Sequence, residues 1–133
     1  MRTLQPPGWQ APKGFANGIA AEGRFLFVAG QVGADPVSGA MAEGFVPQAR
    51  RALENIAAVL REGGAGPEHL TRLTWYVTDM QAYLGQLKPL GQAYREVIGE
   101  HYPAMALVGV TALVFPQALV EIEATAVVPS PRA

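Results

Sequence analysis

The sequence contains no cysteine and only two histidines, His69 and His101. Without cysteine there can be no disulfide framework, no thiolate-bound zinc and no cysteine nucleophile. Two isolated histidines are a poor basis for a metal centre, so both are interpreted as surface or capping residues. We therefore predict neither a bound metal nor an organic cofactor.

Long apolar runs and an excess of one charge are also missing. No run approaches the ~20 apolar residues that a membrane-spanning helix needs, and residues 1–8 lack the apolar core of a secretory signal. The formal net charge is −1 and the pI is about 6.1, which gives no electrostatic basis for binding nucleic acid or anionic lipid. One segment mixes both signs, which is typical of a solvated helix face: Arg50, Arg51, Glu54, Arg61 and Glu62. We predict a cytoplasmic protein.

Apolar residues make up 50% of the 133 residues, and this length fits one domain with one core, so residues 1–133 are predicted to form a single domain. Prolines at 6, 7 and 12 predict an irregular arm over residues 1–14. Residues 19–24 and the apolar segment 25–30 predict a hairpin that turns at 22–24. The turn formers of 33–39 predict a loop.

Helical spacing begins at Phe45, because apolar residues then recur every three or four positions as far as Leu60. The interpretation places a polar set on the opposite face of this helix: Gln48, Arg51, Asn55 and Glu62. Gly63 and Gly64 supply a stop signal.

β-Branched and aromatic residues predict a strand over 70–78, and Asp79 can cap the segment that follows. Pro89 lies inside a second apolar stripe, where an interior proline would cost ~3 kcal/mol. We therefore expect a short turn over 80–87 and a helix from about Pro89, with the proline in its first turn.

Two more strands are expected, over 103–110 and 118–128. The last alternates, with Glu121, Glu123 and Thr125 on one face and apolar residues on the other. The order of elements predicts an α+β fold, a mixed sheet with both helices on one face. The neighbouring strands are too apolar to leave the second face bare, so we infer an oligomer that buries it.

Read in order, several segments resemble one family from about residue 15 to residue 128. The residues Val28-Ala29-Gly30-Gln31-Val32, with Asp35-Pro36 and Gly39, are similar to the strand and loop of the RidA/YjgF family. Further matches are Gln48-Ala49-Arg50, Leu53-Glu54-Asn55-Ile56, Trp75-Tyr76-Val77-Thr78-Asp79-Met80 and Ala118-Leu119-Val120-Glu121-Ile122-Glu123-Ala124. The resemblance implies a chorismate-mutase-like fold and a homotrimer with a cleft at each subunit boundary. It also implies hydrolysis of enamines and imines, such as 2-aminoacrylate, to a keto acid and ammonia.

The resemblance implies four site elements. Glu121 matches the glutamate that activates or positions water, and Ala29 and Gly30 match backbone groups that bind substrate. Phe15 matches an aromatic residue that a neighbouring subunit contributes to close the cleft. Met105 occupies the position of an arginine that forks onto the substrate carboxylate.

Several departures from the family pattern matter. Methionine offers no charge-assisted hydrogen bond, and such a loss typically costs ~10²–10³ in affinity or rate. No residue of 103–110 replaces that arginine, and Phe15 and Ala29 lack the hydroxyl groups that many members have. The helix region carries about four extra residues near 85–88, and a family asparagine corresponds loosely to Gly91.

The alternatives left open concern both residues and function. Glu121 either acts in acid–base chemistry or pairs with an arginine across an interface, whereas Glu123 is interpreted as structural. Met105 either lines a pocket for an apolar or neutral substrate or fills a cleft without chemistry, and Phe15 is either a cleft lid or a staple of the arm. The predicted function is an enamine or imine deaminase-type hydrolase acting on a small C–N substrate. The alternatives are a non-catalytic trimer that binds a metabolite or partner and, more weakly supported, an endoribonuclease.

Overall fold

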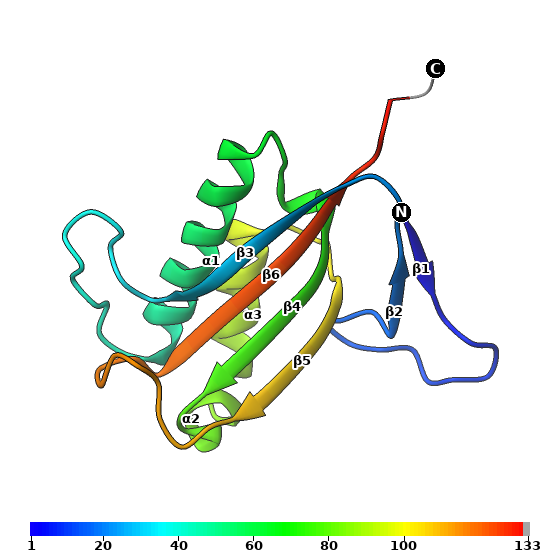
Figure 1. The fold of residues 1–133 in the computed structure, drawn as a ribbon. Helices are drawn as coiled ribbons and strands as arrows, with labels where there is room; N and C mark the ends of the chain where they lie inside the picture. Colours follow the sequence, from blue (N-terminus) through cyan, green and yellow to red (C-terminus); the bar gives the residue numbers. More distant parts are fainter. Residues whose placement is uncertain (132–133) are drawn as a thin grey trace.

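The computed structural model describes residues 1–131 and contains a four-stranded mixed sheet in the order β3-β6-β4-β5 (Figure 1). Strands β3 (Arg24–Val32) and β4 (Leu70–Val77) both pair antiparallel with the central strand β6 (Val120–Val128). Strand β5 (Ala104–Gly109) forms the edge and runs parallel to β4. The expected strands over 70–78, 103–110 and 118–128 are all present.

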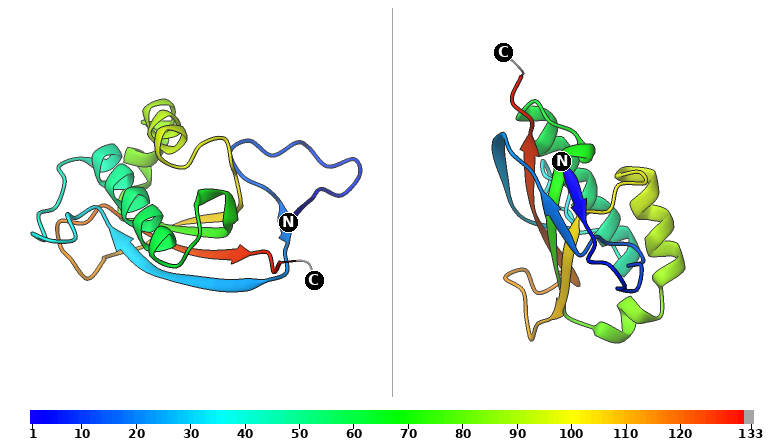
Figure 2. Two further views of the ribbon diagram at one scale, coloured as in Figure 1. Left: turned by 90° about the horizontal axis from the view of Figure 1, so that it is seen from above. Right: turned by 90° about the vertical axis from the view of Figure 1, so that its right-hand side faces the viewer.

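Helices α1 (Phe45–Glu62) and α3 (Leu87–Val97) cover one face of the sheet and leave the other uncovered (Figure 2). The buried core lies between the helices and the sheet, and its fully buried members include Leu53, Ile56, Leu73, Val77 and Ile122. The predicted α+β architecture is therefore confirmed. None of the helices described within residues 1–131 is long and apolar enough to span a membrane.

Helix α1 buries two amide side chains, which corrects the expectation that Gln48 and Asn55 lie on its outer face. Gln48 is only 3% exposed; its Nε2 donates to the carbonyls of Ala42 (2.9 Å) and Gln117 (3.0 Å), and its Oε1 accepts from the N–H of Leu119 (2.7 Å). Asn55 Nδ2 donates to the carbonyl of Ala34 at 2.9 Å. Burial is tolerated because these amides satisfy backbone groups of the loops on either side of the core.

The segment after β4 folds as its residues predict. Asp79 accepts hydrogen bonds from the N–H groups of Gln81 and Ala82 and so caps the short helix α2 (Met80–Leu84). Helix α3 begins at Leu87, which places Pro89 in the first turn, where a missing N–H breaks no helical hydrogen bond. A break at 85–86 separates the two helices within the region of the extra residues.

The N-terminal segment differs from the prediction. The arm contains a strand, β1 (Arg2–Leu4), and this strand pairs antiparallel with β2 (Gly18–Ala20). The expected hairpin over 19–30 is therefore wrong, because β2 pairs with β1 while β3 pairs with β6. The physical reason lies at Gly23, whose φ is 147° and where a Cβ would stand 2.0 Å from the Val128 carbonyl oxygen. The chain crosses close over the end of β6 there instead of turning back on itself.

The uncovered face of the sheet carries large apolar side chains. Phe25 and Phe27 are paired in register with Val127 and Thr125 of β6, and they are 54% and 77% exposed. Val108, paired with Tyr76, is also exposed on this face. Such a surface is typical of an association site.

Replacing the buried amide of Gln48 should destabilise the fold strongly. Gln48→Ala leaves one backbone N–H and two backbone carbonyls without their partner, and we expect unfolding free energy to fall by about 2–4 kcal/mol. Urea unfolding followed by circular dichroism measures the change. Gln92→Ala on the exposed face of α3 is the matched control and should cost less than about 1 kcal/mol. Equal losses for the two variants would contradict the role given to Gln48.

Candidate functional site

Glu121 lies on the uncovered face of the sheet, against the backbone of Gly30. The register between β3 and β6 shifts between Val28 and Gln31, so Ala29 and Gly30 occupy a β-bulge, where both are exposed. A Cβ at Gly30 would stand only 2.2 Å from Glu121 Oε2. Glycine therefore lets the carboxylate lie directly on the bulge, and the structure brings these three predicted residues together.

The neighbouring carboxylate on the same face is engaged differently. Glu123 accepts a hydrogen bond from the hydroxyl of Tyr76, and this contact raises the pKa of Tyr76, because ionisation would break the bond and place a phenolate beside a carboxylate. The side chain of Glu121 makes no hydrogen bond or ion pair with the described residues 1–131. Of the two, only Glu121 is free to act on a ligand.

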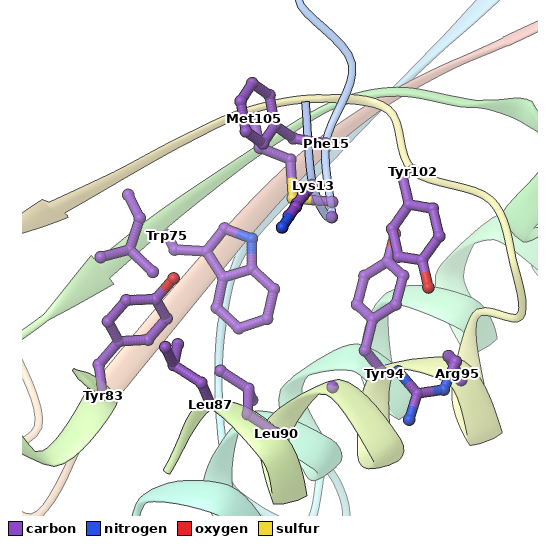
Figure 3. Close-up of a pocket in the computed structure, with 13 residues that line it drawn as sticks. Lys13, Phe15, Trp75, Tyr83, Leu87, Leu90, Tyr94, Arg95, Tyr102 and Met105 are labelled. Atoms are coloured by element: carbon purple, nitrogen blue, oxygen red, sulfur yellow. The ribbon is translucent and has the colours of Figure 1, made fainter. Parts of the chain in front are cut away.

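A pocket of about 630 Å³ lies on the opposite, helix-covered side of the sheet, at the β5 edge (Figure 3). Met105 and Leu107 face this side because they pair in register with the buried Leu73 and Trp75. Helix α3 and the arm complete the walls. The lining residues are Lys13, Gly14, Phe15, Trp75, Tyr83, Leu87, Leu90, Gly91, Tyr94, Arg95, Tyr102, Met105 and Leu107.

Hydrogen bonds hold the arm beside β5 and so place Phe15 in the pocket wall. The N–H of Ala16 donates to the carbonyl of Pro103 at 3.0 Å, and Ala16 forms a parallel bridge with Ala104. Farther along the arm, Asn17 donates to the side chain of Gln5 at 2.8 Å. Phe15 is therefore positioned at the pocket rather than across the core.

The α3 side of the pocket is built from stacked tyrosines. The rings of Tyr94 and Tyr102 are 5.3 Å apart and inclined by 12°, and the hydroxyl of Tyr94 donates to the carbonyl of His101 at 2.6 Å. Burial raises the pKa of Tyr94, so this ring remains neutral at physiological pH. The stack gives that wall a rigid, mostly apolar surface.

The structure thus separates the predicted site residues into two groups. Phe15 and Met105 meet in the pocket, whereas Ala29, Gly30 and Glu121 lie together on the other face of the sheet. A single subunit does not unite them. No cluster of three or more histidine, cysteine, aspartate or glutamate side chains suited to a metal ion occurs among residues 1–131.

Sequence reasoning missed several pocket residues, above all Lys13, Trp75 and Arg95. Trp75 appeared in the sequence analysis only as part of the 75–80 motif, although it lies on the strand that pairs with β5, the strand of Met105. Lys13 and Arg95 come from the arm and from α3, and no local pattern connects either of them with residue 105.

Comparison with known proteins identifies the family. The family model described as Endoribonuclease L-PSP matches residues 9–128. A RutC family protein of Aquifex aeolicus is 34% identical over 130 residues, covering 96% of this chain and 99% of that protein. The chain therefore belongs to the RidA/YjgF family, as its motifs indicated.

Two further proteins are similar to this chain, one in structure and one in sequence. The structure of YyfB, a Rid family protein of unknown function from Yersinia pestis, matches with a TM-score of 0.82 at 32% identity, covering 96% of this chain and 98% of that one. A 2-iminobutanoate/2-iminopropanoate deaminase of Salmonella typhimurium is 33% identical over 109 residues, covering 79% of this chain and 80% of that protein.

The contact between Tyr76 and Glu123 predicts a pH dependence. A raised pKa in the folded state means that the contact stabilises the fold fully below the ordinary tyrosine pKa of ~10, and that this stabilisation is lost as pH rises through the folded-state value. Glu123→Gln removes the charge, so the pKa of Tyr76 should fall. Alkaline titration of tyrosinate absorbance measures it, with Tyr76→Phe identifying the step. Glu22→Gln is the matched control, and a shift of equal size there would contradict the assignment.

Proposed function

We propose that this protein is an enamine or imine deaminase-type hydrolase that acts on a small C–N substrate in clefts between subunits. The observation that carries the proposal is the separation of the two groups: the Phe15–Met105 pocket opens at the β5 edge, while Glu121 lies on the uncovered face. A second copy of the chain can supply Glu121 to the pocket of the first. The deaminase name of the Salmonella relative supports the reaction class.

The chemistry requires one carboxylate. Water adds to the carbon of the C=N bond, and Glu121 takes a proton from that water as the C–O bond forms. Glu121 gives this proton to the imine nitrogen, which yields an amino alcohol. The hydroxyl proton then passes to the same nitrogen through Glu121, the C–N bond breaks, and ammonia leaves as the carbonyl group forms. Water and imine are consumed and ketone and ammonia are produced, so no oxidant or cofactor is needed.

Assembly into a homotrimer accounts for the apolar face. Phe25, Phe27 and Val108 would be removed from water, and Glu121 on the same face would be carried to a subunit boundary. Burial of apolar surface contributes roughly 25 cal/mol per Å², so two phenylalanines are a substantial part of such an interface.

Met105 alters the specificity of this site. An arginine makes two parallel charge-assisted hydrogen bonds to a carboxylate, and methionine makes none. We therefore propose that 2-aminoacrylate and its small imine are processed poorly, and that a substrate with more apolar surface is preferred, since methionine adapts to irregular apolar shapes.

Exchanging two residues tests the reaction and the specificity together. Ammonia release from 2-aminoacrylate should rise about 10- to 100-fold in Met105→Arg, because the guanidinium adds a charged anchor. Glu121→Ala should lower turnover of amino-acid-derived imines about 100-fold or more. Lys88→Arg, on the exposed side of α3, is a control expected to change neither rate.

The outcomes separate the candidate functions. Native turnover that is indifferent to Glu121→Ala contradicts the site assignment. If no form of the protein releases ammonia from any substrate, the non-catalytic binding trimer becomes the better account of the pocket.

Disrupting the apolar face tests the assembly. Phe27→Glu places a charge where the proposal buries an aromatic ring, so we expect a shift from trimer to monomer and loss of ammonia release. Light scattering after size-exclusion chromatography measures the mass. Val37→Glu, on the exposed loop before α1, should leave the mass unchanged, and a trimeric Phe27→Glu variant would count against the proposed interface.

A further inference from the structure

The indole N–H of Trp75 has no hydrogen-bond partner among the residues that the structure describes, although only 4% of Trp75 is exposed. Buried polar groups are nearly always paired, and an unpaired donor is costly, so this one needs a reason. Trp75 lines the pocket, and Figure 3 shows its nitrogen on the ring edge that faces Lys13 and the pocket interior. The indole N–H therefore borders the pocket without an acceptor among the described residues, and a ligand acceptor on this side would satisfy it.

The charges around the pocket all have one sign. Lys13 and Arg95 line it, and no aspartate or glutamate does. Neither cation makes an ion pair in the described part of the chain, where the basic partners are Arg50, Arg51 and His69. Figure 3 shows the nitrogen of Lys13 on the Trp75 side of the pocket and the guanidinium of Arg95 on the far side, near Tyr94. Lys13 is therefore the cation better placed to hold an anion beside Trp75.

The remaining lining residues determine which shape of ligand fits the pocket. Phe15, Leu87, Leu90, Met105 and Leu107 surround the donor with apolar surface. A volume of about 630 Å³ exceeds what a three- or four-carbon acid needs, and it lies in the usual range of pockets for small organic ligands. The ligand that satisfies both features has an anionic end and a bulky apolar body.

We propose that Trp75 Nε1–H and the ammonium of Lys13 together bind the carboxylate of an imino acid with a large apolar side chain. This pair replaces the guanidinium missing at position 105, and Met105 contacts the apolar side chain instead. The inference rests on the proposed function for the reaction, but the anchor is a binding site in its own right. Charge-assisted hydrogen bonds from an N–H and an ammonium suit a carboxylate better than a neutral acceptor.

Nuclear magnetic resonance tests the anchor without any turnover. The probe is 4-methyl-2-oxopentanoate, the stable keto acid that hydrolysis of a branched apolar imino acid would give. Titration into nitrogen-15-labelled protein should move the indole N–H resonance of Trp75 and leave that of the exposed Trp9 in place. Its methyl ester, which lacks the charge, should bind more weakly, and pyruvate, which lacks the apolar body, should also bind more weakly.

Two variants divide the anchor into its parts. Trp75→Phe keeps an aromatic ring but removes the donor, and Lys13→Met keeps an apolar stem but removes the charge. Each should weaken keto-acid binding about 10- to 100-fold and change ester binding by less than about twofold. Lys88→Met is the matched control and should change neither. Because Lys13 is exposed, its variant keeps the test valid even where Trp75→Phe perturbs the core.

The outcomes distinguish this proposal from the proposed function. Keto-acid binding that is unaffected by Lys13→Met, or an unmoved Trp75 resonance at saturation, overturns the anchor even if Glu121-dependent hydrolysis is found. Keto-acid binding that depends on both residues and persists in Glu121→Ala upholds the anchor even if no imine is hydrolysed.

Discussion

Side-chain alternation on the central strand β6 is the constraint that organises this molecule. Val120, Ile122, Ala124 and Ala126 point toward the helices and are buried, so the residues between them must face the other way. Glu121 is therefore excluded from the core by geometry, and it lies over the β-bulge at Gly30. A shift of the register by one residue would bury a carboxylate and expose an apolar row, which makes the position of Glu121 as secure as the core itself.

The fold was predictable wherever local pattern and tertiary structure agree. Apolar periodicity located α1, the Asp79 cap and Pro89 located the helices that follow, and strict alternation located β6. The prediction of a hairpin over 19–30 was wrong because strand propensity does not determine which strands pair. Strand β2 pairs with β1 of the arm instead. Gln48 and Asn55 were assigned to the wrong face because they are polar. Their spacing of seven residues, with Ala52 between them, was the signal that they lie on the buried stripe.

The site was predictable only in part, because its residues come from segments with no shared local pattern. Phe15, Ala29, Gly30, Met105 and Glu121 were predicted from motifs, and the structure groups them into two sets on opposite faces of the sheet. The segment 103–110 around Met105 contains no cation. Lys13 is about ninety positions away and reaches the pocket because the Ala16–Pro103 hydrogen bond fastens the arm to β5.

The attachment of the arm to β5 affects how the sequence of such a protein can change during evolution. The carboxylate of Glu121 sits on a strand that is paired on both sides and whose alternate residues form the core, whereas Lys13 sits on an exposed arm outside the four-stranded sheet. Residues 13–15 can thus vary at little cost to folding while altering which molecules are accepted. Under the proposed roles of Lys13 and Glu121, ligand preference and chemical reactivity are therefore open to selection separately, because the arm can change while the strand that carries Glu121 stays the same.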